Sequence, residues 1–129
     1  LYSPGSATNL LITEALRGAG AYVLNHRGER FLLGKDAGGE LATRDKVTSH
    51  IYGEMQQTQK DHVYLDARHL GPDILRNQFP TVYDRCLQAG FDLAIELVPI
   101  VPAAHYQCGG IKVDHHASTS IPNLFAVGE

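Results

Sequence analysis

An apolar run that contains two prolines, and that leads into a histidine and a glycine pair, places the strongest constraint on this chain. Residues 95–102 are Ile-Glu-Leu-Val-Pro-Ile-Val-Pro, and residues 103–110 continue Ala-Ala-His-Tyr-Gln-Cys-Gly-Gly. Proline lacks the N–H that a central strand donates, so the run predicts an edge strand or a strand that crosses between domains. Glycine has no Cβ, so Gly109 and Gly110 let a flat ligand approach the backbone. On these residues alone, a purely structural histidine at His105 is the more frequent explanation.

Composition indicates one globular domain and excludes two classes of partner. The chain has 129 residues, of which 43% are hydrophobic, and this length and composition are enough to build one hydrophobic core. Its net charge is −3. No run of Lys or Arg could follow a phosphate backbone, which argues against nucleic acid as a partner. No stretch approaches the ~20 apolar residues of a membrane span. The only two cysteines, Cys86 and Cys108, have neither disulfide-scaffold nor metal-finger spacing, so we expect reduced thiols and a cytoplasmic location.

The two ends of the chain suggest a piece of a longer protein. The sequence begins at Leu1 without a methionine, and it stops at Glu129 directly after the apolar run 124–127 and Gly128. A strand followed by Gly-Glu is an unusual end for a natural protein. We therefore expect an excised segment.

Helical periodicity is clearest over residues 44–57. Apolar residues recur there at the spacing of one helix face, at Val47, Ile51 and Met55. Thr43 is the expected N-cap, and Asp45 is favourable in the first turn. Arg44 is not, because a cation at a helix N-terminus is disfavoured by the helix dipole. It lies there either for a partner or because it is exposed to solvent.

The other elements predict an α+β fold with a small mixed antiparallel sheet and several helices. Helices are expected over 10–17, 72–79 and 81–89, the last with Val82, Cys86 and Leu87 toward the core. A hairpin is expected from 21–25 and 29–33, and 34–40 is a glycine-rich, flexible connection. Further strands are expected at 62–66, 95–102, 111–113 and 124–127, the last one buried, with a polar turn region over 114–122.

Several polar residues lie at the ends of these elements and could together hold a small diacid. They are Thr13, Glu14, Arg17, Arg44 and His105. Arginine binds a carboxylate through its planar fork, and His or Thr fixes a second carboxylate by hydrogen bonds. No metal site is predicted, because Asp114, His115 and His116 lie in a turn and adjacent histidines point in different directions. No nucleophile-elbow, P-loop or dinucleotide fingerprint occurs.

Five motifs in order resemble the L-aspartate oxidase family, which belongs to the succinate dehydrogenase and fumarate reductase flavoproteins. They are residues 13–22 (Thr-Glu-Ala-Leu-Arg-Gly-Ala-Gly-Ala-Tyr), 28–31 (Gly-Glu-Arg-Phe), 41–45 (Leu-Ala-Thr-Arg-Asp), 63–66 (Val-Tyr-Leu-Asp) and 102–110. The resemblance implies the capping domain of this flavoprotein type. Residues 1–10 would be a flank from the FAD domain, 11–105 the capping domain that closes over substrate, and 106–129 the flank that returns to the FAD domain.

The resemblance also implies roles for individual residues. Arg44 matches the active-site arginine that transfers a proton and compensates substrate charge. Substrate binding would fall to His105, Thr13 and Glu14, with Arg17 behind them. Contacts to FAD, which would be bound mainly by a domain outside this chain, would fall to Glu129, Tyr106, Gly109 and Gly110.

The implied reaction is the oxidation of L-aspartate, or another four-carbon dicarboxylate, by FAD. L-Aspartate would become iminoaspartate for de novo NAD biosynthesis, and quinolinate synthase would take the product. The cap would close over flavin and substrate, with residues 34–39 as a mobile lid, and the chain alone would be inactive.

Departures from the family pattern leave two alternatives open. Thr43 stands where proline is common, Ser3 stands where histidine is common, and the family's His-Pro-Thr substrate motif is not in this sequence. A succinate dehydrogenase or fumarate reductase flavoprotein is the nearest rival, although Ala103, Ala104 and Cys108 differ from its pattern. The other alternative is a stand-alone module that binds small carboxylates.

Overall fold

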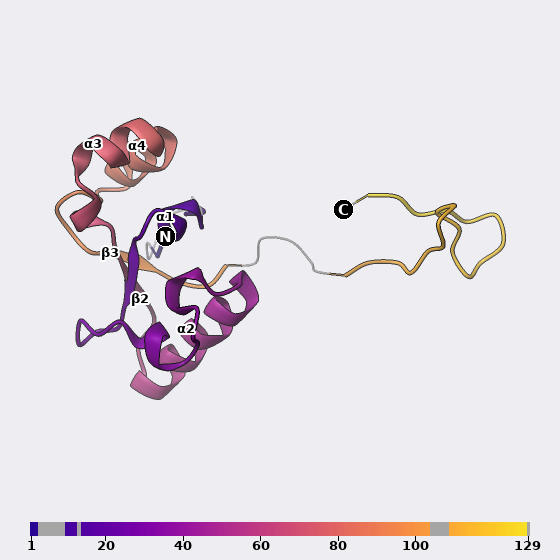
Figure 1. Ribbon diagram of the computed structural model, residues 1–129, viewed down its shortest axis with the longest axis horizontal. Helices are drawn as coiled ribbons and strands as arrows, with labels where there is room; N and C mark the ends of the chain where they lie inside the picture. Colours follow the sequence, from indigo (N-terminus) through magenta and orange to yellow (C-terminus); the bar gives the residue numbers. More distant parts are fainter. Residues whose placement is uncertain (3–9, 13, 104–108, 129) are drawn as a thin grey trace.

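A three-stranded antiparallel sheet forms the centre of the molecule in the computed structural model, which describes residues 1–2, 10–12, 14–103 and 109–128. The strands are β1 (Tyr22–Leu24), β2 (Val63–Asp66) and β3 (Val98–Ile100), in the spatial order β1-β2-β3 (Figure 1). Val23 pairs with Leu65, and Leu65 pairs with Val98, and all three side chains are buried. The sheet and its helices confirm the predicted α+β class.

The predicted edge strand is present as β3, but it is shorter than the expected 95–102 and contains only Pro99 of the two prolines. Pro99 lies opposite Tyr64 in the register with β2. On the other side of β3, the Pro99 carbonyl accepts a hydrogen bond from the Tyr2 backbone N–H at 2.8 Å. Proline is tolerated there because its missing donor would face away from β2.

Helix α2 (Arg44–Thr58) lies near one end of the strands, while α3 (Pro72–Gln78) and α4 (Pro80–Gln88) lie together near the other end (Figure 1). All three helices contribute side chains to one hydrophobic core. Val47 and Ile51 are buried and Met55 packs against the same core, which confirms the predicted helix and its face. Thr43 occupies the N-cap position as predicted, but its side chain makes no capping hydrogen bond. No helix among the described residues has the length and apolar character to cross a membrane.

The face of α4 that enters the core differs from the prediction at one position. Cys86 is fully buried as expected and Val82 packs against the core, but Leu87 is 43% exposed. Tyr83 takes the buried place instead. Cys86 is the centre of the buried face, and residues 82 and 83 lie within about 60° of it around the helix, whereas residue 87 is rotated by about 100° from it.

The first helix is shorter than predicted, and the second strand of the predicted hairpin is a helical turn. Helix α1 spans Ala15–Gly18, overlapping only the end of the expected 10–17 region, and η1 (Phe31–Gly34) replaces the strand at 29–33. The Asn25 side-chain oxygen accepts hydrogen bonds from the backbone N–H groups of Arg27 and Glu29, both at 3.0 Å. These bonds close the turn tightly, and Phe31 and Leu32 then enter the core.

The connection at 34–40, predicted as flexible, forms hydrogen-bonded turns instead. Lys35 and Asp36 donate backbone hydrogen bonds to Leu32, and Gly39 donates to Asp36. A second short helix, η2 (Gly39–Leu41), follows, with Glu40 buried. Farther along the chain, η3 (Arg68–Leu70) links β2 to α3. The glycines allow these turns, and the buried Glu40 then fixes them against β1.

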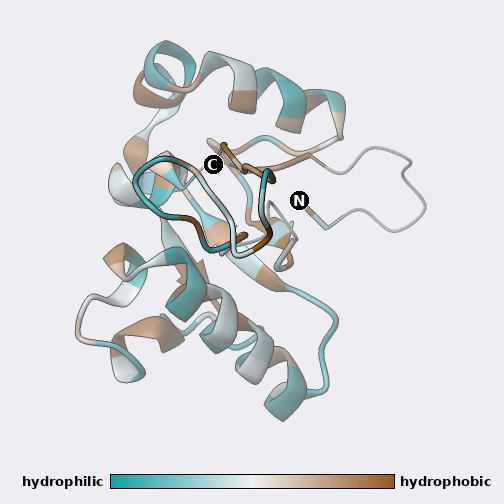
Figure 2. Ribbon diagram, turned by 90° about the vertical axis from the view of Figure 1, so that its right-hand side faces the viewer, coloured by the Kyte–Doolittle hydropathy of each residue, from teal (hydrophilic) through white to brown (hydrophobic). Residues whose placement is uncertain are grey.

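The predicted strands at 111–113 and 124–127 are wrong. Residues 111–113 form no strand, and only Phe125 joins an isolated bridge, with Ser118. The predicted buried run is exposed, with Val127 at 90%. A strand needs a neighbour to pair with, and residues 109–128 lie away from the sheet (Figure 1), mixing hydrophilic and hydrophobic residues along the segment (Figure 2). The predicted polar turn is present, since Asp114 accepts hydrogen bonds from the backbone of His116 and Ser118.

Candidate functional site

Three of the polar residues predicted to hold a diacid lie together at the junction of α1 and α2. Glu14 is the N-cap residue of α1, Arg17 lies in α1, and Arg44 is the first residue of α2. Four other predicted site residues lie outside the described part of the chain. They are Thr13, His105, Tyr106 and Glu129.

The Glu14 carboxylate lies between two guanidinium groups. Its Oε2 accepts a hydrogen bond from Arg44 Nε at 2.5 Å, and Arg17 Nη2 lies 3.7 Å from the same oxygen. The side chains of Glu14 and Arg44 are 46% and 53% exposed, so both remain accessible. The junction therefore carries two positive charges around one negative charge, an excess that can meet a substrate carboxylate.

Arg17 is held more deeply than Arg44. Its side chain is only 14% exposed, and Nη1 donates hydrogen bonds to the carbonyl oxygens of Glu40 at 2.5 Å and Ala42 at 3.4 Å. Burial lowers the pKa of Arg17, the Glu14 carboxylate acts in the opposite direction, and the positive charge of Arg44 lowers it further. The two carbonyl oxygens therefore fix the orientation of the Arg17 guanidinium, which is more buried than the Glu14 and Arg44 side chains.

A second ion pair, between Glu40 and Arg30, was absent from the predicted site and lies next to Arg17. Glu40 is 5% exposed, and its carboxylate accepts two hydrogen bonds from Arg30, Nε to Oε1 at 3.0 Å and Nη2 to Oε2 at 2.9 Å. Burial acts to raise the pKa of Glu40, but these bonds and one from the Val23 N–H outweigh it, and the pKa lies below its usual value. The sequence offered one signal for this pair, a carboxylate within a glycine-rich segment. It did not identify the partner, because Arg30 lies ten residues away in the sequence.

Arg30 is itself held by the Tyr22 ring of β1, which stacks on a ring from η3. Its guanidinium carbon lies 3.8 Å from the centre of the Tyr22 ring, and the Tyr22 ring stacks on His69 with centroids 4.2 Å apart. The His69 Nε2–H donates to the Gly20 carbonyl at 2.9 Å. The stack anchors the Arg30 and Glu40 pair to the strand.

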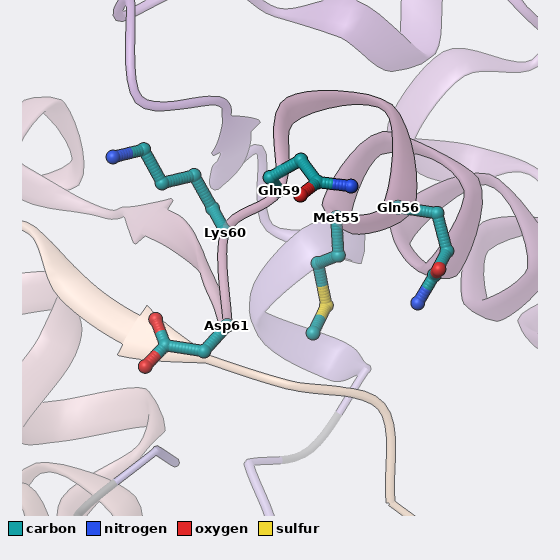
Figure 3. A pocket seen from close by; sticks show the side chains of 5 residues that line it. All are labelled: Met55, Gln56, Gln59, Lys60 and Asp61. Carbon is teal, nitrogen blue, oxygen red and sulfur yellow. The ribbon is translucent and has the colours of Figure 1, made fainter.

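One hollow on the described surface adjoins the junction, and another lies away from it. The first, of about 290 Å³, is lined by Arg17, Tyr22, Arg30, Glu40 and neighbouring small and apolar residues. The second, of about 330 Å³, lies at the end of α2 and is lined by Met55, Gln56, Gln59, Lys60 and Asp61 (Figure 3). In Figure 3 the Lys60 side chain extends away from Met55. Only the first hollow contains a residue of the predicted site.

The glycine pair fits the close approach of a flat ring. Gly109 and Gly110 have φ angles of 113° and 150°, and both are exposed. A Cβ at either position would meet no described atom within 4 Å, so backbone conformation and not crowding requires glycine here. The backbone at the glycine pair is open on the side that a Cβ would occupy.

The remaining titratable residues form no metal centre in the described ranges. No group of three or more His, Cys, Asp or Glu side chains there could hold a metal ion. His115 and His116 lie in the exposed turn that the sequence predicted. The chemistry that the described residues support is carboxylate binding by arginine.

Comparison with known sequences places the whole chain in one family. The family model described as FAD binding domain matches residues 1–129. The L-aspartate oxidase of Pseudomonas aeruginosa is 50% identical over 129 residues, and that of Vibrio cholerae is 46% identical over 129 residues. The chain spans 24% of the length of each of these relatives.

Solved structures of fumarate reductases share the fold. A quinol-fumarate reductase with menaquinol molecules superposes with a TM-score of 0.78 at 35% identity, over 92% of this chain and 24% of its own. A point mutant of the E. coli quinol fumarate reductase gives a TM-score of 0.82 at 34% identity, over 95% of this chain and 24% of its own. Both kinds of relative agree with the resemblance carried by the five motifs. The chain belongs to the FAD binding domain family of flavoproteins, with L-aspartate oxidases among its sequence relatives and fumarate reductases among its structural neighbours.

Proposed function

We propose that this chain is the capping domain, with short flanks, of an FAD-dependent L-aspartate oxidase. The observation that carries the proposal is the placement of Arg44 and Arg17 around Glu14, in a chain that is similar over its whole length to L-aspartate oxidases. The proposed boundaries are 1–10 and 106–129 for the flanks and 11–105 for the cap. Since the chain spans 24% of those relatives, the activity would belong to the longer protein.

Substrate binding would rest on charge and on hydrogen bonds from both sides of the diacid. We assign one carboxylate of L-aspartate to His105 and Arg44, and the other end to Thr13 and Glu14. Arg44 is half exposed and lies at the start of α2, so its planar fork can turn from Glu14 toward a carboxylate. Closure of the cap would exclude water and strengthen these contacts.

Oxidation of L-aspartate to iminoaspartate removes a hydride from the carbon that bears nitrogen and a proton from the amino group. FAD, when bound, supplies the hydride acceptor. Gly109 and Gly110, with Tyr106 and Glu129, would form this chain's contacts to the ring, and the open backbone at the glycine pair supports that assignment. Arg44 would move the proton, and Glu14 is already hydrogen-bonded to its Nε.

The product indicates the place of the reaction. Iminoaspartate is an unstable imine, so an enzyme that consumes it promptly is needed, and we propose quinolinate synthase in de novo NAD biosynthesis. The expected location is the cytoplasm, where both cysteines would stay reduced.

The test uses the full-length parent protein with FAD under anaerobic conditions. L-Aspartate should bleach the visible flavin absorbance, and succinate should not. Bleaching by succinate alone would instead place the protein with the succinate dehydrogenases, and absence of flavin binding would support a stand-alone carboxylate-binding module.

A fumarate reductase or succinate dehydrogenase flavoprotein is the second candidate. The TM-scores of 0.78 and 0.82 with fumarate reductases favour it. The same arginines would then hold fumarate or succinate, which carry no amino group. Fumarate-dependent reoxidation of the reduced flavin, with no reduction by L-aspartate, is the result that would favour this candidate.

A further inference from the structure

We propose that Glu40 is a positioning residue for the arginine pair. Its buried carboxylate, clamped by Arg30, fixes the segment 38–42, and that segment sets the direction of Arg17 and the starting point of α2 at Arg44. The inference rests on the proposed oxidase function for its readout in turnover, and on the contacts of Glu40 for its geometry.

The carboxylate of Glu40 has one orientation. Arg30 binds both of its oxygens, at 3.0 and 2.9 Å, and the Val23 N–H lies 3.4 Å from Oε1. A two-point fork fixes the plane of the carboxylate as well as its position. Glu40 is 5% exposed while the Arg30 side chain is 37% exposed, so the carboxylate is enclosed and its partner reaches it from the surface.

The backbone of Glu40 contacts Arg17 directly, so the position of Glu40 also determines where Arg17 is bound. The Glu40 carbonyl accepts from Arg17 Nη1 at 2.5 Å, and the Ala42 carbonyl lies 3.4 Å from the same nitrogen. Both acceptors belong to the segment that the Glu40 side chain holds. A shift of this segment therefore moves both acceptors together and turns the Arg17 guanidinium away from Glu14.

The segment also determines where α2 begins. Thr43 follows Ala42 directly, and its carbonyl accepts the Val47 N–H at 3.0 Å, the first bond of the helix. Arg44 is the next residue, and its Nε reaches Glu14 at 2.5 Å. The clamp thus lies at the base of the segment that brings Arg44 to Glu14.

An ion pair that is largely removed from water adds little to the free energy of unfolding. A buried pair can be replaced by apolar residues of similar volume with little or no loss of stability, because desolvation offsets the attraction. Arg30 is further anchored by the Tyr22 ring at 3.8 Å, which ties the clamp to β1. The Glu40 and Arg30 pair is thus fixed to β1 and connected through segment 38–42 to Arg17 and Arg44. It is therefore in a position to orient these two arginines.

The experiment compares Glu40→Gln, Arg30→Gln and Arg30→Lys in the full-length parent protein. Arg27→Gln is the matched control, because Arg27 forms a similar pair with Glu29 but is 74% exposed and contacts neither arginine of the junction. Turnover of L-aspartate is measured per bound flavin, together with KM. Hydrogen exchange of the amides of residues 41–47 is measured in the same proteins.

We expect Glu40→Gln and Arg30→Gln to lower kcat by about 10- to 100-fold, the range that a displacement near 1 Å can cause. KM should change less, because Arg44 keeps its charge. Arg30→Lys, which keeps the charge and loses the fork, should restore part of kcat. Amides 41–47 should exchange faster in the Gln variants and unchanged in Arg27→Gln.

Two results would overturn the inference. One is an unchanged kcat per bound flavin in Glu40→Gln with a lowered melting temperature, which would make the pair structural only. The other is unchanged exchange at 41–47, which would show that Glu40 does not hold the segment. A wild-type protein that fails to oxidise L-aspartate would refute the proposed function instead, and the exchange measurement would still decide on the clamp.

Discussion

Arg44 Nε donates a hydrogen bond of 2.5 Å to Glu14 Oε2, joining the first residue of α2 to the N-cap residue of α1 across 30 positions of sequence. Both side chains are about half exposed. Exposed ion pairs contribute only about 0–1 kcal/mol to stability. The pair is therefore expected to matter for binding and proton transfer far more than for folding.

Replacement of Arg44 separates these two effects. In the full-length parent protein, Arg44→Leu should slow flavin reduction by L-aspartate by about 10²- to 10⁴-fold, the usual contribution of a positioned proton-transfer group. The melting temperature should change by little. Anaerobic stopped-flow absorbance and thermal unfolding measure the two quantities.

Arg85→Leu is the matched control for Arg44→Leu. Arg85 is an exposed arginine on α4, a helix that lies apart from α2 in Figure 1. Its replacement should leave the rate of flavin reduction unchanged. An equal loss of rate in both variants would show that the effect of Arg44 is not local.

The pair of Asp66 and Arg68 should make stability depend on pH in the acid range. Arg68 donates to both Asp66 oxygens, at 2.8 and 2.9 Å, and this hydrogen bonding lowers the pKa of Asp66 against the opposing effect of burial. A carboxylate with a lowered folded-state pKa stabilises the fold above its unfolded pKa of about 3.9, and this contribution is lost as pH falls through the folded-state pKa.

Asp66→Asn tests this pH dependence. The wild type should have the higher free energy of unfolding at pH 7, and the difference between the two proteins should shrink as the pH falls below about 4. Urea unfolding at a series of pH values measures it. A difference that stays constant down to pH 2.5 would contradict the assignment.

Cys86 should be unreactive in the folded chain. It is fully buried on α4, and burial raises the pKa of its thiol from 9.0 to about 11. Since the thiolate is the reactive form, Ellman's reagent at pH 8 should label Cys86 only after urea unfolding, when measured in a Cys108→Ser background. Rapid labelling of the native protein would contradict the buried position.

Leu16 links the core to the arginine junction and should be costly to truncate. It is fully buried on α1 beside Arg17. Leu16→Ala should lower the free energy of unfolding by about 2–5 kcal/mol, because it leaves a cavity in addition to the lost apolar contacts.

Leu87→Ala is the control of the same chemistry. Leu87 is 43% exposed, so its truncation should change the free energy of unfolding by less than about 0.5 kcal/mol. Urea unfolding of both variants measures the two effects. A large loss in Leu87→Ala would support the originally predicted helix face and not the observed one.

The local elements followed from local patterns. The 3.6-residue periodicity of Val47 and Ile51 predicted α2, and the helix predicted from Pro72 is α3. The helix predicted at 81–89 begins one residue earlier, at Pro80. Pro99 predicted the edge position of β3. Each of these signals acts within a few residues of chain, so no knowledge of the rest of the fold is needed to interpret it.

Tertiary contacts decided the rest. The strand predicted at 29–33 is the helical turn η1, whose Phe31 and Leu32 pack into the core, and the apolar run at 124–127 is exposed because no described strand pairs along it. The sequence could nominate Glu14, Arg17 and Arg44, but only the packing of α1 against the segment 39–42 brought them together. Glu40 and Arg30 were missed altogether, because a buried ion pair is a property of two distant residues and of the surface that covers them, and a single sequence encodes neither directly.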